Sequence, residues 1–171
     1  MDAAEFERVA ETWATFHRRF APLFGRPEAQ DRSEQYLRGL LVQRGERRNA
    51  ENLAEAVGGV SPRVLQRFLT EAPWPVARVR DRLHAFLGER LNAPDGVFVL
   101  DDTGFAKQGT HSVGVARQYS GTLGKVGNCQ VGVFLGYASA RGHALVDARL
   151  FLPREWTEEP ARCRAAGVPQ R

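Results

Sequence analysis

The chain has 171 residues, of which 43% are hydrophobic, and 24 basic against 20 acidic side chains give it a formal net charge of +4. This length suits one ordinary domain, or a small domain with part of a second, and the hydrophobic content excludes a globally disordered chain. No apolar stretch approaches the roughly 18 residues of a membrane-spanning helix. The acidic, amphipathic start argues against a signal peptide and predicts a cytoplasmic protein. Cys129 and Cys163 lack a CxxC spacing, so neither a zinc site nor a disulfide framework is expected.

Arginine supplies nearly all of the positive charge, and Lys107 and Lys125 are the only lysines. The planar guanidinium group suits phosphate, which favours a polyanionic partner such as nucleic acid. Codon bias in a GC-rich genome would raise the arginine content equally well, so both explanations stay open. Residues 96–171 hold 9 basic and 6 acidic side chains, whereas residues 1–95 hold 15 and 14, so the second part is the more cationic.

The first 41 residues predict two helices. The first helix rests on five apolar residues at helical spacing, which are read as core rather than as a binding face. Pro22 and residues 25–33 interrupt this pattern, and Ser33 is predicted to cap a second helix whose leucines face inward. The five apolar residues are Phe6, Val9, Trp13, Phe16 and Phe20.

Three more helices are predicted between residues 49 and 91. Asn49 is expected to cap a third helix that ends at Val57, before two glycines. Ser61 and Pro62 are expected to open a fourth helix, and residues 76–91 form a fifth.

The third and fourth helices have the outline of a helix-turn-helix, because both are short and a glycine-containing turn joins them. The fourth helix would then present Arg63, Gln66 and Arg67 to DNA. A helical cap packed on the following domain explains the same pattern equally well.

Residues 93–171 change to an extended pattern, so the predicted fold is α+β: a helical region over residues 1–92, followed by mainly antiparallel strands. Residues 96–100 are continuously apolar and predict a central strand buried on both faces. Further strands are expected over residues 112–119, 129–137 and 143–152. A strand that ends in acid and is followed by antiparallel strands is how an RNase H-like domain starts.

Asp101 and Asp102 follow the apolar strand directly. They are compatible with a metal site that cuts nucleic acid, with a phosphate-handling enzyme, or with an ordinary solvated turn. Carboxylates bind Mg²⁺ or Mn²⁺ through oxygen, and a metal pair can activate water at a phosphodiester. If the strand continues through the pair, the two side chains point to opposite faces and one alone is a ligand. Asp147 is a possible second acid, although its mid-strand position suits a surface salt bridge better.

The segment after the acids interleaves cations and hydrogen-bond donors with glycines, which suits contacts to phosphate. The glycines match no nucleotide-binding motif, and no serine lies in a nucleophile-elbow context. His111 could be a general base but is more simply a solvated histidine, and Cys129 is expected to pack in a strand. The candidate phosphate-binding residues are Lys107, Arg117, Gln118 and Lys125.

Three stretches carry a family resemblance: YLRGLLVQRGERRNAENLAEAVGGVSPRVLQRFLTEAPW, VLDDTGFAKQGTHSVGVARQYSGTLGKVGNCQVGVFLGYAS and ALVDARLFLPREWTEEPARCRAAGVP. Together they run from about Tyr36 to Pro169, and they resemble DDE-type insertion-sequence transposases, also described as DDE superfamily endonucleases. The resemblance implies an RNase H-like fold preceded by a helical DNA-binding region. It also implies Mg²⁺ or Mn²⁺ as cofactor, with transposon ends and target DNA as partners. Asp101 matches the first acid of the catalytic triad, and Asp102 the acidic position after it.

The chain departs from the family pattern at its end, because the family's second Asp and final Glu lie beyond the AGVP segment. The resemblance therefore implies the N-terminal portion of a transposase, truncated and without cleavage activity of its own. Three alternatives follow. In the first, an omitted or frameshifted remainder supplies the missing acids. In the second, the chain is a truncated product that binds transposon ends, full-length transposase or further copies of itself, and inhibits the transposase. In the third, the reading frame has decayed. Glu155, Glu158 and Glu159 lie in a segment that resembles a structural connector.

Overall fold

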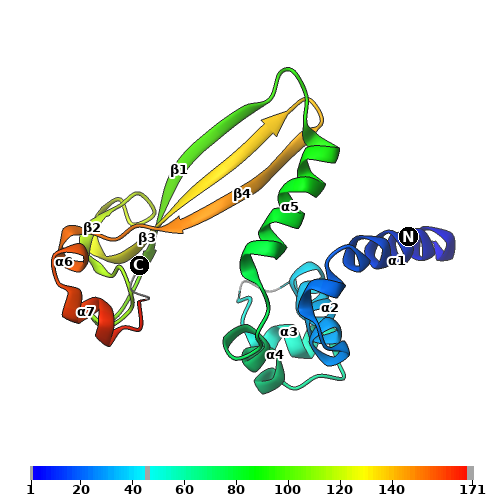
Figure 1. The fold of residues 1–171 in the computed structure, drawn as a ribbon, viewed down its shortest axis with the longest axis horizontal. Helices are drawn as coiled ribbons and strands as arrows, with labels where there is room; N and C mark the ends of the chain where they lie inside the picture. Colours follow the sequence, from blue (N-terminus) through cyan, green and yellow to red (C-terminus); the bar gives the residue numbers. More distant parts are fainter. Residues whose placement is uncertain (1, 45–46, 169–171) are drawn as a thin grey trace. The chain divides into compact units, whose positions relative to one another are not determined.

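The computed structural model describes residues 2–44 and 47–168 (Figure 1). The chain divides into two compact units between Leu83 and His84. This division falls inside helix α5 (Val76–Leu91), ahead of the boundary expected at residue 92. None of the helices among the described residues is long and apolar enough to cross a bilayer.

The first unit is helical. Its helices are α1 (Ala3–Arg18), the 3-10 helix η1 (Ala21–Phe24), α2 (Pro27–Val42), α3 (Ala50–Val57), α4 (Pro62–Thr70) and the start of α5. Asp2 and Glu5 form a capping box at the start of α1. Asn49 caps α3 as predicted, because its side chain accepts a hydrogen bond from the Asn52 amide (2.9 Å).

Helix α2 begins at Pro27, so the prediction that Ser33 caps the second helix is wrong. Proline suits the first turn of a helix, where its missing N–H removes no helical bond. Ser33 lies in the helix interior and is buried. Its hydroxyl donates to the Gln30 carbonyl (2.7 Å) and therefore accepts from His17 Nε2 (2.8 Å).

The core of the first unit lies between α2, α3 and α4. Leu53, Ala54 and Leu65 are buried there, with Tyr36 and Leu40 packed against them. The stripe on α1 was expected to be core along its whole length, but only its end is buried. Phe20 is buried, whereas Phe6 and Val9 are exposed among the described residues.

The second unit is built on an antiparallel sheet. Its strands are β1 (Val97–Ala106), β2 (Ala116–Ser120), β3 (Lys125–Ser139) and β4 (Gly142–Leu150). Strand β3 is central and lies between β1 and β4 (Figure 1). Strand β2 pairs with the first residues of β3, on the side away from β1, because Cys129 is the partner of both Ala106 and Ala116. Helices α6 (Arg154–Thr157) and α7 (Pro160–Ala165) follow. The α+β class is thus confirmed.

Strand β1 is an edge strand in the described structure, which corrects the prediction of a central strand buried on both faces. Its apolar residues are open to solvent: Phe98 is 68% exposed and Leu100 is 71% exposed. Strand β1 also runs through the acid pair to Ala106, because its ladder with β3 continues to Cys129. The two acids therefore lie within a strand and not in a turn.

The core of the second unit lies beside β2 and α6. Trp156 is buried and its indole N–H donates to the Val115 carbonyl (2.8 Å). The Arg162 guanidinium lies 4.2 Å from the centre of the Trp156 ring. Cys129 is buried in β3, as expected. These contacts fix β2 and the segment before it.

Candidate nucleic-acid interface

Asp101 and Asp102 lie on opposite faces of the sheet. Their Cα partners on β3 are Phe134 and Val133, and side chains alternate between the two faces along each strand. Both acids are exposed, and Asp101 Oδ1 accepts a hydrogen bond from the Asp102 amide (2.8 Å). We call the two surfaces the Asp101 face and the Asp102 face. A single ion cannot be held by both carboxylates without breaking the strand.

On the Asp102 face, a second acid, Asp147, is paired with an arginine. Asp102 is in register with Val133, and Val133 in turn with Arg149. Arg149 makes a bidentate ion pair with Asp147, at 3.0 Å from Nη1 to Oδ1 and 2.9 Å from Nη2 to Oδ2. Asp147 thus forms the surface salt bridge expected of a mid-strand acid.

The fit of these acids to a divalent metal can be tested from the donors. Among the residues that the structure describes, no three His, Cys, Asp or Glu side chains gather where they could hold an ion. Mg²⁺ requires near-octahedral oxygen coordination and is usually anchored by one or two carboxylates plus phosphate. The described residues therefore do not form a complete two-metal site, and no chemical step is derived through one.

The Asp101 face carries a row of polar residues across three strands. The Lys107 amide donates to the Asn128 carbonyl (3.0 Å), and Asn128 is the Cα partner of Arg117 on β2. Asn128 Nδ2 donates to the carbonyls of Lys107 (2.9 Å) and Gly109 (2.8 Å), which fixes the end of β1. Two strand spacings place the backbones of Lys107 and Arg117 about 10 Å apart. We call Lys107, Asn128 and Arg117 the cationic row.

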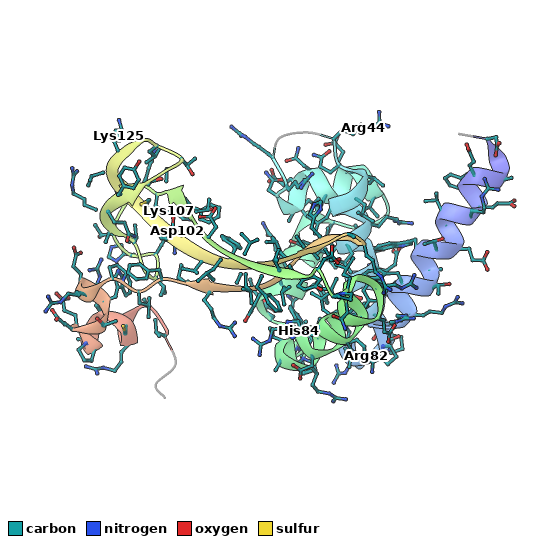
Figure 2. All side chains as sticks on the ribbon, turned by 90° about the horizontal axis from the view of Figure 1, so that it is seen from above. Arg44, Arg82, His84, Asp102, Lys107 and Lys125 are labelled. Atoms are coloured by element: carbon teal, nitrogen blue, oxygen red, sulfur yellow. The ribbon has the colours of Figure 1, made fainter. Side chains whose placement is uncertain are left out.

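Gln118 and Lys125 do not lie on the same face as Lys107 and Arg117. Gln118 follows Arg117 and therefore projects to the Asp102 face, where its amide donates to the carbonyls of Cys129 (2.9 Å) and Gly114 (3.4 Å). Lys125 is exposed at the start of β3 and is paired with Ser120 (Figure 2). Of the four residues after the acids that are predicted to bind phosphate, Lys107 and Arg117 thus share one face with Asp101.

His111 lies apart from the acids. It is exposed and lines a hollow together with Trp156, Glu159 and Arg162. The structure therefore does not bring it to the acid pair as a general base.

The three candidates on α4 are exposed. Leu65 and Phe68 are buried beneath them, while Arg63, Gln66 and Arg67 face solvent. Arg67 Nε also forms an ion pair with Glu71 Oε2 (2.8 Å). The first unit thus has a solvent-facing, arginine-bearing helix, separate from the sheet residues of the second unit.

The sequence pattern does not single out Phe105 on the Asp101 face, and it indicates Tyr119 only as a hydrogen-bond donor in the segment after the acids, not as an exposed ring. The available signal was alternation: Phe105 lies four residues after Asp101, and Tyr119 lies two after Arg117. The register between β1, β2 and β3 was needed to place them on one surface.

Comparison with known proteins agrees with the quoted motifs. The family model described as DDE superfamily endonuclease matches residues 19–171. A probable transposase for insertion sequence element IS701 from Microchaete diplosiphon is 33% identical over 95 residues, which cover 53% of this chain and 25% of that protein. The matched segment thus spans about a quarter of the relative's length. No solved structure matches. The chain belongs to the DDE superfamily endonucleases.

Proposed function

We propose that this chain serves DNA transposition as a DNA-binding portion of an insertion-sequence transposase and does not cleave DNA by itself. The observation that carries the proposal is the cationic row, which lies on the same sheet face as Asp101. Two cationic side chains on backbones about 10 Å apart suit contacts along a phosphate backbone better than contacts to a small anionic ligand. Arg63, Gln66 and Arg67 are proposed to give a second contact to DNA from α4, and Gln118 and Lys125 to flank the first.

Asp101 is proposed to supply one carboxylate to the Mg²⁺ or Mn²⁺ that endonucleases of this superfamily generally use. Asp102 points to the other face, so it is not part of the same ligand set.

Fluorescence anisotropy tests the DNA-binding proposal. Labelled 30-bp duplexes from the DNA flanking the coding sequence are titrated with the purified chain at several salt concentrations, beside scrambled duplexes. Lys107→Ala and Arg117→Ala are each expected to weaken all duplexes and to reduce the slope of log affinity against log salt by about 0.9. Arg141→Ala, at an exposed position beyond the β3–β4 pairing, is the matched control.

The α4 contact has its own readout. Arg63→Ala and Gln66→Ala are expected to reduce the preference for flanking over scrambled duplexes, because base-edge contacts carry the sequence information. Arg78→Ala on α5 is the control, since Arg78 is exposed on another helix. If all three variants lose this preference to the same extent, α4 has no role in sequence recognition.

Cleavage is tested on a supercoiled plasmid that carries the same flanks, with Mg²⁺ or Mn²⁺. No nicking is expected. Metal-dependent nicking that Asp101→Asn abolishes would contradict the proposed inactivity.

A second candidate function is inhibition of a full-length transposase, and the exposed edge of β1 favours it. The Lys107 amide points to β3, so even-numbered residues such as Phe98 and Leu100 direct their backbone groups away from the described sheet. Such an edge accepts a strand from another chain. Leu100→Pro would block strand addition while sparing the bonds to β3, and it is expected to abolish co-purification with the full-length protein without loss of DNA binding.

A further inference from the structure

Two exposed aromatic side chains flank the cationic row. Phe105 is 47% exposed and Tyr119 is 66% exposed. Phe105 lies two residues before Lys107 on β1, and Tyr119 lies two residues after Arg117 on β2. Because side chains two apart in a strand share a face, both rings lie on the Asp101 face.

The Phe105 ring is held in place by its neighbours. It packs edge-on against Phe134, with ring centroids 6.3 Å apart at 63°. Gly132 leaves the room that the two rings fill: a Cβ there would come within 2.9 Å of the Phe134 ring and 3.3 Å of the Phe105 ring. The ring is therefore braced on one side while its remaining surface is open to solvent.

The register orders these groups along β3. Phe134 is opposite Asp101, Gln130 is opposite Phe105, and Asn128 joins Lys107 to Arg117. At about 3.3 Å per residue, Phe105 lies about 13 Å and Lys107 about 20 Å from Asp101 along the strand. The register thus orders an acid, an aromatic ring, cations and a second aromatic ring along β3.

The other face is different. Phe98 and Tyr137, which project to the Asp102 face, line a hollow with His84 and Leu87 of α5. His84 Nε2–H also donates to the Val146 carbonyl (2.9 Å). The part of α5 from His84 onward thus lies against the Asp102 face, and the exposed rings of Phe105 and Tyr119 are on the opposite one.

We propose that the Asp101 face binds unpaired DNA nucleotides, whose bases stack on Phe105 and Tyr119 while their phosphates contact Lys107 and Arg117. A duplex hides the faces of its bases, so exposed rings beside cations gain most from a strand whose bases are free to stack. The positive charge of the row fits a polyanion and disfavours an apolar protein partner. The inference rests on the proposed DNA binding and names the form of DNA that this face takes.

The test compares fluorescein-labelled dT12 with a 12-bp hairpin duplex, using the full chain at fixed salt. Phe105→Ala and Tyr119→Ala are each expected to weaken dT12 binding about 5-fold to 100-fold and to change duplex binding less than about twofold. Tyr119→Phe, which keeps the ring, is expected to retain dT12 binding. Phe151→Ala is the matched control: Phe151 is also 47% exposed, and its amide bonds to Val131, whose side chain lies on the other face.

A second measurement does not depend on variant folding. Photocrosslinking of a 5-iodouracil-substituted dT12 to the unaltered chain, followed by peptide mapping, is expected to label Phe105 or Tyr119. Crosslinks confined to α4 or to the Asp102 face would overturn the inference.

The outcomes separate this inference from the proposed function. If both alanine variants bind dT12 as Phe151→Ala does, while Lys107→Ala weakens duplex and single strand alike, DNA binding stands and stacking is refuted. If the unaltered chain binds neither DNA, both proposals fail. If Phe105→Ala instead turns a dimer into a monomer in analytical ultracentrifugation and leaves dT12 binding intact, the face is a protein interface.

Discussion

Gly104→Ala is predicted to destabilise the second unit strongly, because β2 passes close to β1 at this glycine. A Cβ at position 104 would lie 2.3 Å from Ser120 Oγ, 2.7 Å from Ser120 Cβ and 3.1 Å from Ser120 Cα. Ser120 is buried, and the Cα belongs to backbone that a rotamer change cannot move. Overpacking of a filled site costs about 1–3 kcal/mol, and we expect the upper part of that range.

Ser120→Gly supplies the matched partner, since it removes the two closest atoms and leaves the contact at 3.1 Å. In the double variant the two substitutions should couple favourably by about 1 kcal/mol or more. Ser120→Gly alone is expected to cost about 1 kcal/mol from backbone entropy and its weak hydrogen bond to the Gly104 carbonyl (3.5 Å).

Urea denaturation followed by tryptophan fluorescence measures these effects. Trp156 lies in the second unit, whereas Trp13 and Trp74 lie in the first, so the titrations are made in a background with phenylalanine at both of those positions. A Gly104→Ala variant within about 0.5 kcal/mol of its parent, or a double variant that is no better than additive, would refute the argument.

Three further predictions concern other parts of the chain. Burial lowers the pKa of His17 below its usual 6.5, against the raising effect of Glu34 and then Asp31, so the unfolded chain takes up the proton more readily. The contribution of His17 to the stability of the first unit should be complete above pH 6.5 and should decline as the pH falls below that value. A His17→Gln variant whose urea midpoint shows the same decline would contradict this. Trp156→Phe removes the donor to the Val115 carbonyl and should destabilise the second unit by about 1–3 kcal/mol, measured by urea denaturation followed by circular dichroism because the variant lacks the reporting tryptophan; an unchanged midpoint would show that Arg162, whose Nη2 lies 3.3 Å from that carbonyl, takes over the role. Asp101→Asn removes a negative charge from the proposed DNA face and should tighten duplex binding at low salt, whereas Asp102→Asn should not; equal effects in anisotropy would place both faces equally near the DNA.

The helices were predictable where the signal is local. The Asn49 cap and the inward positions of Leu65 and Phe68 follow from residues within one helix. The prediction that Ser33 caps the second helix is wrong because Pro27 starts that helix earlier. The hydroxyl of Ser33 is bonded instead to the buried His17. That partner is 16 residues away in sequence, so no local pattern contains it.

The strands show the same division. Alternation alone was enough to predict that Asp101 and Asp102 point apart if the strand continues through them, and β1 does continue. The apolar run before them indicates burial on both faces, yet in the described structure it lies at an edge, because the run does not specify which strand pairs with it. Likewise, Lys107 and Arg117 share a row only through Asn128, which is a property of register between strands and not of composition.

The irregular pairing of β3 with β4 has a consequence for variation in the gene. The register shifts between Leu135 and Gly136, on the side of β3 away from β1. A slip by one residue between two strands exchanges the faces of one strand relative to the other, and a slip of β2 against β3 would move Arg117 off the face that carries Asp101 and Lys107. A bulge takes up one extra residue locally. Insertions at the turn around Arg141 can therefore be accommodated without a change of register at the cationic row, so length changes should be tolerated there. Length changes in the turn between Ser120 and Lys125 should be selected against, because this turn joins β2 to β3.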